Sequence, residues 1–254
     1  SSSPHRHALL RMSVRSLLRK ADVVVGQSRN TVENVHKYYL PELPCELIPL
    51  GIQRRQLPEA DRAALGLKPD DFVMVTIGRL VSRKAVDQLI TMMARLDRSA
   101  ARLVIIGDGP LKAELESQAE SLGVANRVTF AGFVTEERKA ELLAASDLYV
   151  STSQHEGFGL VFLEGMSAGI PVVCYDFGGQ TDFLDDGQTG ALVPLNDLDA
   201  FTGACQRFMD SADALNAAGA ENLKRVESFY IDNCARRYET LFSRVIEDSR
   251  KAVS

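Results

Sequence analysis

Two glutamates separated by seven residues are the most informative feature of this amino-acid sequence. Glu156 and Glu164 bracket a stretch in which Gly157 and Gly159 are expected to open a short helix and Gly169 to close it. A helix that starts at glycines exposes free backbone N–H groups and the positive end of its dipole, both of which suit a phosphate. Two carboxylates beside such a start can accept hydrogen bonds from hydroxyls. The stretch therefore predicts a site for a ligand that carries phosphate and hydroxyl groups, such as those of a sugar and a ribose.

Positive charge is expected close to this site. Gly78, Arg79 and Lys84 follow a strand predicted at Phe72–Ile77. A glycine in the turn lets a ligand approach the backbone, and the two cations suit a diphosphate. Taken alone the pattern is weak, because arginine and lysine near the start of a helix are common on any protein surface.

Two further turns follow predicted strands. The turn at residues 107–110 has the sequence Gly-Asp-Gly-Pro, but it is not a dinucleotide-binding fingerprint, because Lys112 stands where the third glycine should fall. Phe133 and Val134 follow the strand predicted at Arg127–Phe130. An aromatic side chain at a strand end either borders a flat base or belongs to the core, and the sequence leaves both possibilities open.

Gly178 and Gly179 follow another predicted strand, at Pro171–Cys174, and are expected to open a helix. Adjacent glycines after a strand favour close approach of the backbone to a ligand. Asp197 and Asp199 imitate an acidic metal motif, but they stand at an expected helix start, where acids interact favourably with the dipole. These two acids are therefore interpreted as helix-start residues and not as metal ligands.

Short apolar runs alternate with helical patterns along the chain, which predicts a doubly wound α/β fold with a parallel, Rossmann-like sheet. The expected strands are Val23–Val25, Cys45–Pro49, Phe72–Ile77, Arg102–Ile106, Arg127–Phe130, Leu148–Ser151 and Pro171–Cys174. The expected helices between them include Val86–Leu96, Leu111–Ser121, Glu136–Ala145 and Phe158–Ala168. From about residue 197 onward only helices are expected, the last over Ile231–Ile246. Ligands bind at the carboxyl ends of the strands in such sheets, so the turns after the strands carry the predicted site.

The chain is predicted to consist of unequal parts. Residues 1–50 offer too few elements to bury a core and are interpreted as the tail of a preceding domain that is mostly absent. Residues 51–70 are interpreted as a linker and residues 71–230 as the sheet domain. Residues 231–254 are expected to form a helix that packs back toward the first part.

Composition restricts the class of protein. A formal net charge of −5 argues against nucleic-acid binding, which usually needs a basic surface. No apolar run approaches the roughly 20 residues that span a bilayer, and the N-terminus lacks the pattern of a signal peptide. The four cysteines are scattered without a metal-ligand spacing, which is typical of a reducing compartment. A cytoplasmic protein is therefore expected.

A basic helix is expected at residues 9–20. Arg11, Arg15 and Arg19 recur every four residues on one of its faces. Such a helix can lie on an anionic membrane surface, which would place the protein at the inner face of the membrane. It can equally form the edge of a domain, with its arginines in solvent or against a partner domain. The sequence leaves both interpretations open.

Taken together, the turn motifs resemble those of a large enzyme family. The motifs that carry the resemblance are, in order, Gly78-Arg79 with Lys84, Gly107-Asp108-Gly109-Pro110, Glu156-x7-Glu164 and Gly178-Gly179. They are similar to those of the retaining glycosyltransferases with the GT-B fold, which consist of two Rossmann-like domains and carry the domain called Glycosyl transferases group 1. From about Ala21 onward the chain resembles the C-terminal, donor-binding half of that family.

The resemblance implies a role for each matching residue in binding a nucleotide-diphospho-sugar. Arg79 and Lys84, beside Gly78, would neutralise the diphosphate, and the backbone N–H groups near Leu160 and Val161 would bind the distal phosphate. Glu164 would bind the ribose, and Glu156 would bind the donor sugar together with the backbone at Gly157, Phe158 and Gly159. Phe133 and Val134 would contact the base. Glu156, Arg79 and Lys84 are the implied catalytic residues. The resemblance implies no required metal and no other cofactor.

The sequence departs from the family pattern at several points. Ala85 follows Lys84 where many relatives have glycine, and Asp182 stands where glutamate is usual. The family's N-terminal domain, which binds the acceptor and supplies a catalytic histidine, has no counterpart in this sequence. A glycan, lipid-linked or small-molecule acceptor would be bound by that domain. Three interpretations stay open: a hexosyltransferase half, a nucleotide-sugar-binding module without turnover of its own, and a sugar-nucleotide epimerase on the same fold.

Overall fold

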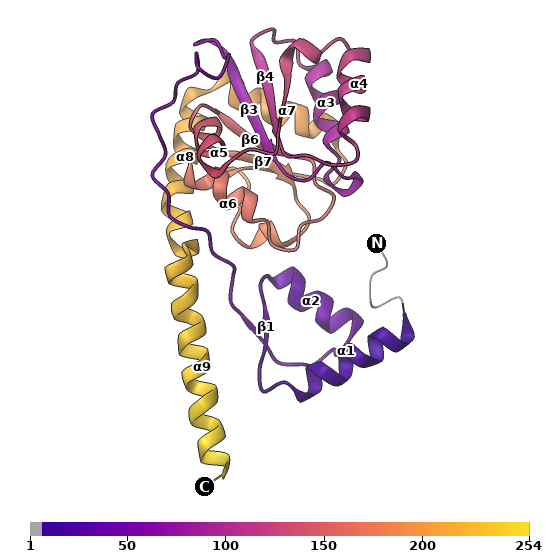
Figure 1. Cartoon of the computed structure of the whole chain (residues 1–254), viewed down its shortest axis with the longest axis vertical. Helices are drawn as coiled ribbons and strands as arrows, with labels where there is room; N and C mark the ends of the chain where they lie inside the picture. The colour runs from indigo at the N-terminus through magenta and orange to yellow at the C-terminus, as the bar shows by residue number, and fades with distance from the viewer. Residues whose placement is uncertain (1–6, 254) are drawn as a thin grey trace.

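The computed structural model describes residues 7–253, so the first six residues of the segment 1–50 and the last residue of the chain lie outside the description. Its larger part is a six-stranded parallel sheet with helices on both faces (Figure 1). The strand order is β5-β4-β3-β6-β7-β8. The strands are β3 (Phe72–Ile77), β4 (Ala101–Ile106), β5 (Val128–Gly132), β6 (Leu148–Ser151), β7 (Val172–Tyr175) and β8 (Gly190–Val193). The predicted α/β fold is confirmed.

Both faces of the sheet are buried, because alternate side chains of each strand enter one of two hydrophobic clusters. In β3, Met74 belongs to one cluster, while Val73 and Val75 belong to the other. The helices that cover the sheet are α3 (Val86–Arg95), α4 (Lys112–Ser121), α5 (Glu136–Ala144), α6 (Leu160–Ser167), α7 (Leu198–Asp210) and α8 (Ala212–Val226). This packing leaves only the ends of the strands accessible to a ligand.

The structure shifts several predicted boundaries by one or two residues and makes larger corrections in three places. Strand β8 is not expected from the sequence. The helix expected after Gly178 is only a 3₁₀ turn, Gly179–Asp182, because Phe183 and Leu184 enter the core directly after it. The last helix, α9, covers Ile231–Val253 and is longer than expected. None of the helices within residues 7–253 combines the length and the hydropathy that a bilayer crossing requires.

The N-terminal part, residues 7–50, lies beside the edge of the larger part (Figure 1). It contains α1 (Ala8–Lys20), β1 (Val24–Gly26), α2 (Arg29–Tyr38) and β2 (Cys45–Leu47), and its two strands pair in parallel in a sheet of their own. Ser28 Oγ donates to the Gly157 carbonyl at 2.8 Å, and the Arg29 N–H donates to Asp182 at 2.7 Å. Asp182, one of the departures from the family pattern, thus joins the two parts. The assignment of residues 1–50 to a preceding domain stays a prediction.

Helix α1 confirms the expected helix at residues 9–20. Leu9, Met12 and Leu17 are at least 64% exposed. Arg15 does not face solvent freely, because its Nε donates to the Tyr39 carbonyl at 2.6 Å. One of the three arginines on the predicted basic face is therefore used inside the N-terminal part, and contact of this helix with a membrane stays a prediction.

The chain passes between the two parts twice, and the two passages are hydrogen-bonded to each other. The Ile52 N–H donates to the Phe229 carbonyl at 2.9 Å, and the Ile231 N–H donates to the Ile52 carbonyl at 2.8 Å. Helix α9 starts at this point and runs past the N-terminal part (Figure 1), where Arg244 pairs with Glu46. The last helix thus contacts the N-terminal part, and the division of the chain into the predicted segments stays a prediction.

Candidate functional site

The carboxyl ends of β3, β4 and β5 are held together by hydrogen bonds between glycine-containing turns. The Gly78 N–H donates to the Ile106 carbonyl at 2.9 Å, and the Gly107 N–H donates to the Gly132 carbonyl at 2.8 Å. Gly107 has a φ of 134°, and a Cβ added to it would lie 2.0 Å from the carbonyl oxygen of Gly78. A side chain at Gly107 would not fit between these turns, so the backbone of the turns stays closely packed at the strand ends.

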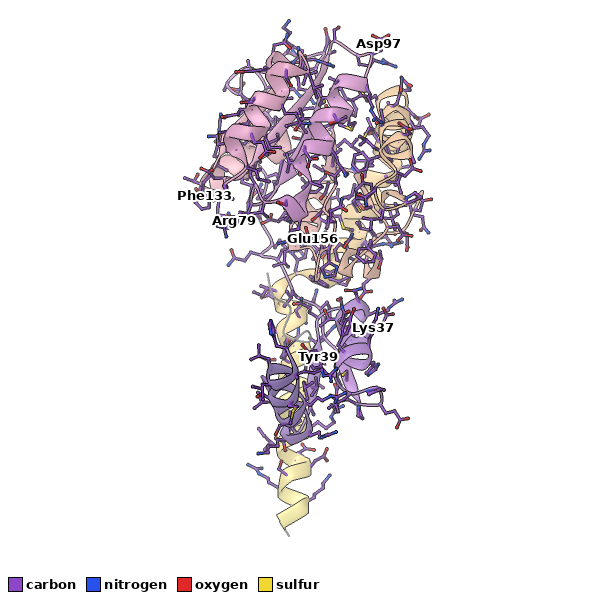
Figure 2. The ribbon with its side chains drawn as sticks, turned by 90° about the vertical axis from the view of Figure 1, so that its right-hand side faces the viewer. Lys37, Tyr39, Arg79, Asp97, Phe133 and Glu156 are labelled. Carbon is purple, nitrogen blue, oxygen red and sulfur yellow. The ribbon has the colours of Figure 1, made fainter. Side chains whose placement is uncertain are left out.

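A cavity of about 410 Å³ lies over these strand ends. Gly78, Arg79, Phe133 and Val134 line it, so it brings together four residues expected from the sequence. Phe133 is 91% exposed and therefore does not belong to the core. Arg79 lies near Phe133, on the side of the larger part that also carries Glu156 (Figure 2). Within residues 7–253 the Arg79 guanidinium has no hydrogen-bond or ion-pair partner, so it is available to an anion.

Glu156 is held in a buried ion pair next to these turns. Its Oε1 accepts hydrogen bonds from Lys84 Nζ and, at 2.8 Å, from Ser153 Oγ. Arg83 lies 3.6 Å from its Oε2. The Glu156 and Lys84 side chains are only 10% and 11% exposed. Lys84 reaches the acid by passing over Gly78, since a Cβ on that glycine would lie 3.2 Å from Lys84 Cε.

Ala85, another departure from the family pattern, has a conformational explanation. Its φ of 45° lies in the left-handed region, which favours glycine. Thr152 Oγ1 fixes this backbone by donating to the Ala85 carbonyl at 2.7 Å. Alanine thus keeps the turn that joins Lys84 to α3, at a conformational cost of about 1 kcal/mol relative to glycine.

The start of α6 has the open geometry that the sequence predicts. Gly159, with a φ of 98°, is the residue before the helix. The N–H groups of Leu160 and Val161 form no hydrogen bond with any residue from 7 to 253. Phe158 anchors the preceding loop, because it is 3% exposed and its ring centroid lies 5.2 Å from that of Phe183. Unpaired N–H groups at a helix start carry the positive end of the dipole, so this loop can bind an anion through its backbone.

The paired glycines support that loop. The Gly179 N–H donates to the Glu156 carbonyl at 2.8 Å. A Cβ on Gly179 would lie 2.2 Å from the carbonyl oxygen of Gly157, and one on Gly178 would lie 2.7 Å from that of Glu156. The glycines are required by the close approach of the backbone at residues 156–159, and their approach to a ligand stays a prediction.

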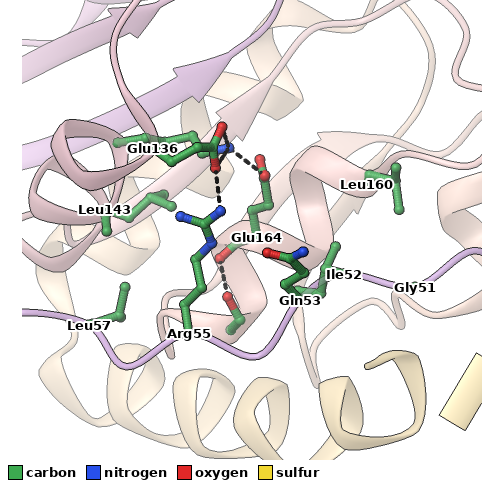
Figure 3. A pocket seen from close by; sticks show the side chains of 12 residues that line it. Gly51, Ile52, Gln53, Arg55, Leu57, Glu136, Leu143, Leu160 and Glu164 are labelled. Carbon is green, nitrogen blue, oxygen red and sulfur yellow. Dashed lines mark hydrogen bonds and ion pairs between the residues drawn. The ribbon is translucent and has the colours of Figure 1, made fainter. Parts of the chain in front are cut away.

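Glu164 belongs to a chain of four alternating charges (Figure 3). Its Oε1 accepts a hydrogen bond from Lys139 Nζ at 2.6 Å. Lys139 Nζ also lies 2.9 Å from Glu136 Oε2, and Arg55 lies 3.2 Å from the same oxygen. Burial by itself lowers the pKa of Lys139, but the hydrogen bonds to Glu164 and Glu136 outweigh burial and raise the pKa. The lysine therefore carries its positive charge at neutral pH.

A second cavity, of about 230 Å³, lies in front of Glu164. Leu160 and Glu164 of α6 line one side of it, and the segment 51–57 crosses the other (Figure 3). Glu136 and Lys139 line this cavity and also the larger one at the strand ends. The two cavities therefore meet at these two side chains.

Four residues of the site are not predicted from the sequence: Lys139, Glu136, Arg55 and Ser153. Glu136 and Lys139 stand three residues apart on α5, the spacing of an ordinary ion pair on a helix surface. Their further partners come from α6 and from the segment 51–57, and no local pattern announces those contacts. The available signal is position, because α5 begins directly after the end of β5, where ligands bind in such sheets.

Comparison with known proteins agrees with the motifs. The N-acetyl-alpha-D-glucosaminyl L-malate synthase of Bacillus anthracis is 26% identical over 255 residues, which cover 98% of this chain and 65% of that protein. The GDP-mannose-dependent alpha-(1-6)-phosphatidylinositol monomannoside mannosyltransferase of Mycobacterium tuberculosis is 32% identical over 231 residues, covering 82% of this chain and 59% of that protein. This chain thus spans about three fifths of the length of these two relatives.

The fold has close counterparts among solved structures. The Anabaena protein HepE in complex with UDP superposes with a TM-score of 0.86 at 23% identity, covering 95% of this chain and 70% of that one. The family described as Glycosyl transferases group 1 matches residues 58–225, which is most of the larger part. The chain therefore belongs to the family Glycosyl transferases group 1.

Proposed function

We propose that this chain is the donor-binding half of a retaining hexosyltransferase that uses a nucleotide-diphospho-sugar. The observation that carries the proposal is the placement of Glu156 and Glu164 on either side of the open start of α6, each with a lysine at its carboxylate. The mannosyltransferase relative is named as GDP-mannose-dependent, and the HepE structure holds UDP. Both support a nucleotide-sugar as the donor, while the identity of the base and the sugar is not part of the proposal.

The nucleotide is assigned to the edge formed by the strand ends. Its base would lie against Phe133 and Val134, and its ribose would reach Glu164 past the junction of the two cavities. The exposed ring of Phe133 offers a flat apolar surface to a base. The diphosphate would lie between Arg79 and the N–H groups at the start of α6.

The same groups would promote departure of the nucleoside diphosphate. When the bond between the sugar and the diphosphate breaks, negative charge grows on the leaving oxygen. Arg79, Lys84 and the start of α6 are already in place to stabilise that charge, which lowers the barrier without reorganisation at the moment of reaction. These cations can take the part that a metal ion plays in other transferases, so the proposal requires no metal. Glu156 would accept hydrogen bonds from hydroxyls of the donor sugar.

Acceptor binding is assigned to the portion of the relatives that this chain does not span. That incomplete span favours a second candidate function for the isolated chain, which would then hold a nucleotide-sugar without transferring it. The two candidates share the donor site and differ in turnover alone.

Calorimetric titration of the chain with UDP-, GDP- and ADP-glucose and with GDP-mannose tests the donor site. One of these compounds is expected to bind, and Glu164→Ala is expected to weaken its binding by roughly ten- to a hundredfold, because a hydrogen bond to a charged group contributes about 1.5–3 kcal/mol. Glu120→Ala is the matched control, since Glu120 is an exposed acid on α4 outside both cavities. Absence of binding by every compound at millimolar concentration would contradict the proposal.

A further inference from the structure

We propose that Lys139 is a ribose-binding residue, which forms hydrogen bonds with the ribose hydroxyls together with Glu164. These bonds would give the site a preference for ribonucleotides over deoxyribonucleotides. The inference rests on the proposed function, because it assigns a further contact to the same nucleotide.

The Lys139 ammonium group is held by two carboxylates. Lys139 Nζ donates to Glu164 at 2.6 Å and to Glu136 at 3.0 Å. Both carboxylate oxygens of Glu136 lie at this distance, Oε2 at 2.9 Å, and share one N–H of the ammonium. With a second N–H on Glu164, the third of its three N–H donors is left for a ligand. The side chain is only 15% exposed, and what remains accessible belongs to the cavities at whose junction it lies.

The pair formed by Lys139 and Glu164 is complementary to a hydroxyl group. Lys139 occupies Oε1 of Glu164, while Oε2 of Glu164 accepts no hydrogen bond from residues 7–253. A free carboxylate oxygen accepts a hydrogen bond, and an ammonium N–H donates one. A ribose hydroxyl can do both at once, because it has one donor and two acceptor positions. A deoxyribose carbon at the same place can do neither.

The negative charge of Glu136 is balanced by a second cation besides Lys139. Arg55 lies 3.2 Å from Glu136 Oε2 and supplies a positive charge from the opposite wall of the cavity. Removing the lysine would therefore leave Glu136 paired and would affect mainly Glu164 and the space in front of it. This separates a role in ligand recognition from a role in holding α5.

The arrangement of the two cavities also places the ribose beside Lys139. The larger cavity contains Phe133 and Arg79, and the smaller one contains Leu160 and Glu164. The residues that line both are Glu136 and Lys139. A nucleotide that extends from the base position to the start of α6 must place its middle unit, the ribose, against this junction.

The test compares matched ligands on matched variants. The tightest binder among UDP, GDP and ADP is titrated into the chain by calorimetry, together with its 2′-deoxy and 3′-deoxy counterparts. The wild-type chain is expected to bind the ribonucleotide about tenfold more tightly than at least one deoxy counterpart. Lys139→Met is expected to reduce that ratio to about threefold or less, with little change in the affinity for the deoxy compound. Lys139→Arg is expected to restore a substantial part of the ratio, because it keeps a charged donor.

Arg138→Met is the control, because Arg138 is the neighbouring cation on α5, pairs with Glu141 and lines neither cavity. An equal loss of affinity for the ribo and deoxy compounds in Lys139→Met would overturn the assignment and make Lys139 a structural residue. Equal binding of both compounds by the wild-type chain would overturn it without any variant, so the test survives a variant that fails to fold. Failure of all three nucleotides to bind the wild-type chain would instead overturn the proposed function itself.

Discussion

Replacement of Glu156 by alanine is expected to lower the free energy of unfolding by about 3–5 kcal/mol, because it leaves the Lys84 ammonium buried without a counter-charge. The two side chains are 10% and 11% exposed, so bulk solvent screens the Lys84 charge only weakly. Ser153 loses its acceptor at the same time. Arg83, at 3.6 Å from Oε2, adds a second cation and increases the unfavourable charge. Urea denaturation followed by circular dichroism measures the effect.

The cause can be separated from a general loss of packing by a second variant. Glu156→Ala combined with Lys84→Met removes both charges and is expected to regain most of the lost stability, since replacing a buried ion pair by apolar groups is often neutral. Nucleotide-sugar binding should not return, because both members of the pair belong to the proposed donor site. A loss of less than about 1 kcal/mol in Glu156→Ala, the range of an exposed pair, would show that the pair is not effectively buried.

Replacement of Gly107 by alanine is expected to cost about 4 kcal/mol of stability and to abolish nucleotide binding. The backbone φ of 134° is strained for any residue with a side chain, and the added Cβ would lie 2.0 Å from the carbonyl oxygen of Gly78. Relief of that overlap must separate the ends of β3 and β4, which form the floor of the larger cavity. Thermal unfolding and calorimetric titration of the same preparation measure the two losses.

Gly123 offers the matched control for this substitution. It also has a left-handed φ, of 70°, but a Cβ added there meets nothing within 4 Å. Gly123→Ala should therefore cost only about 1 kcal/mol and leave ligand binding unchanged. Similar losses in the two variants would mean that backbone strain alone acts at Gly107, and that the contact with Gly78 has no energetic weight.

The sequence predicts those features of the fold that depend on local pattern. The ends of β3 and β6 agree with the predicted ones, because continuous apolar runs bounded by polar residues define them. Strand β8 is missed, because its four residues begin with a glycine and have no distinctive pattern of their own. It exists as a strand by pairing with β7, where a Cβ on Gly190 would lie 1.8 Å from the Val172 carbonyl oxygen. That closeness is a property of the packed sheet.

The same distinction applies to the candidate site. The spacing of Glu156 and Glu164 and the glycines between them correctly predict an open helix start. Of the lysine partners of the two acids, the sequence predicts one and not the other. Lys84 is found because it follows a strand end, whereas Lys139 is missed because its contact with Glu164 joins two helices 25 residues apart in the chain. The contact of the paired glycines with residues 156–157 is likewise not predicted, because a sequence does not show which backbone segments lie close together.

The two hydrogen-bonded passages of the chain at Ile52 have a mechanical consequence. A single peptide connection lets two bodies swivel freely, whereas two connections fastened side by side resist torsion and leave bending as the soft motion. Arg244 also ties α9 to Glu46 of the N-terminal part. Bending about this line would change the distance between the N-terminal part and the loop at Gly157, where Ser28 now bridges the two. The second passage thus fastens a second connection beside the first, and we expect the two together to resist torsion of the N-terminal part against the larger part.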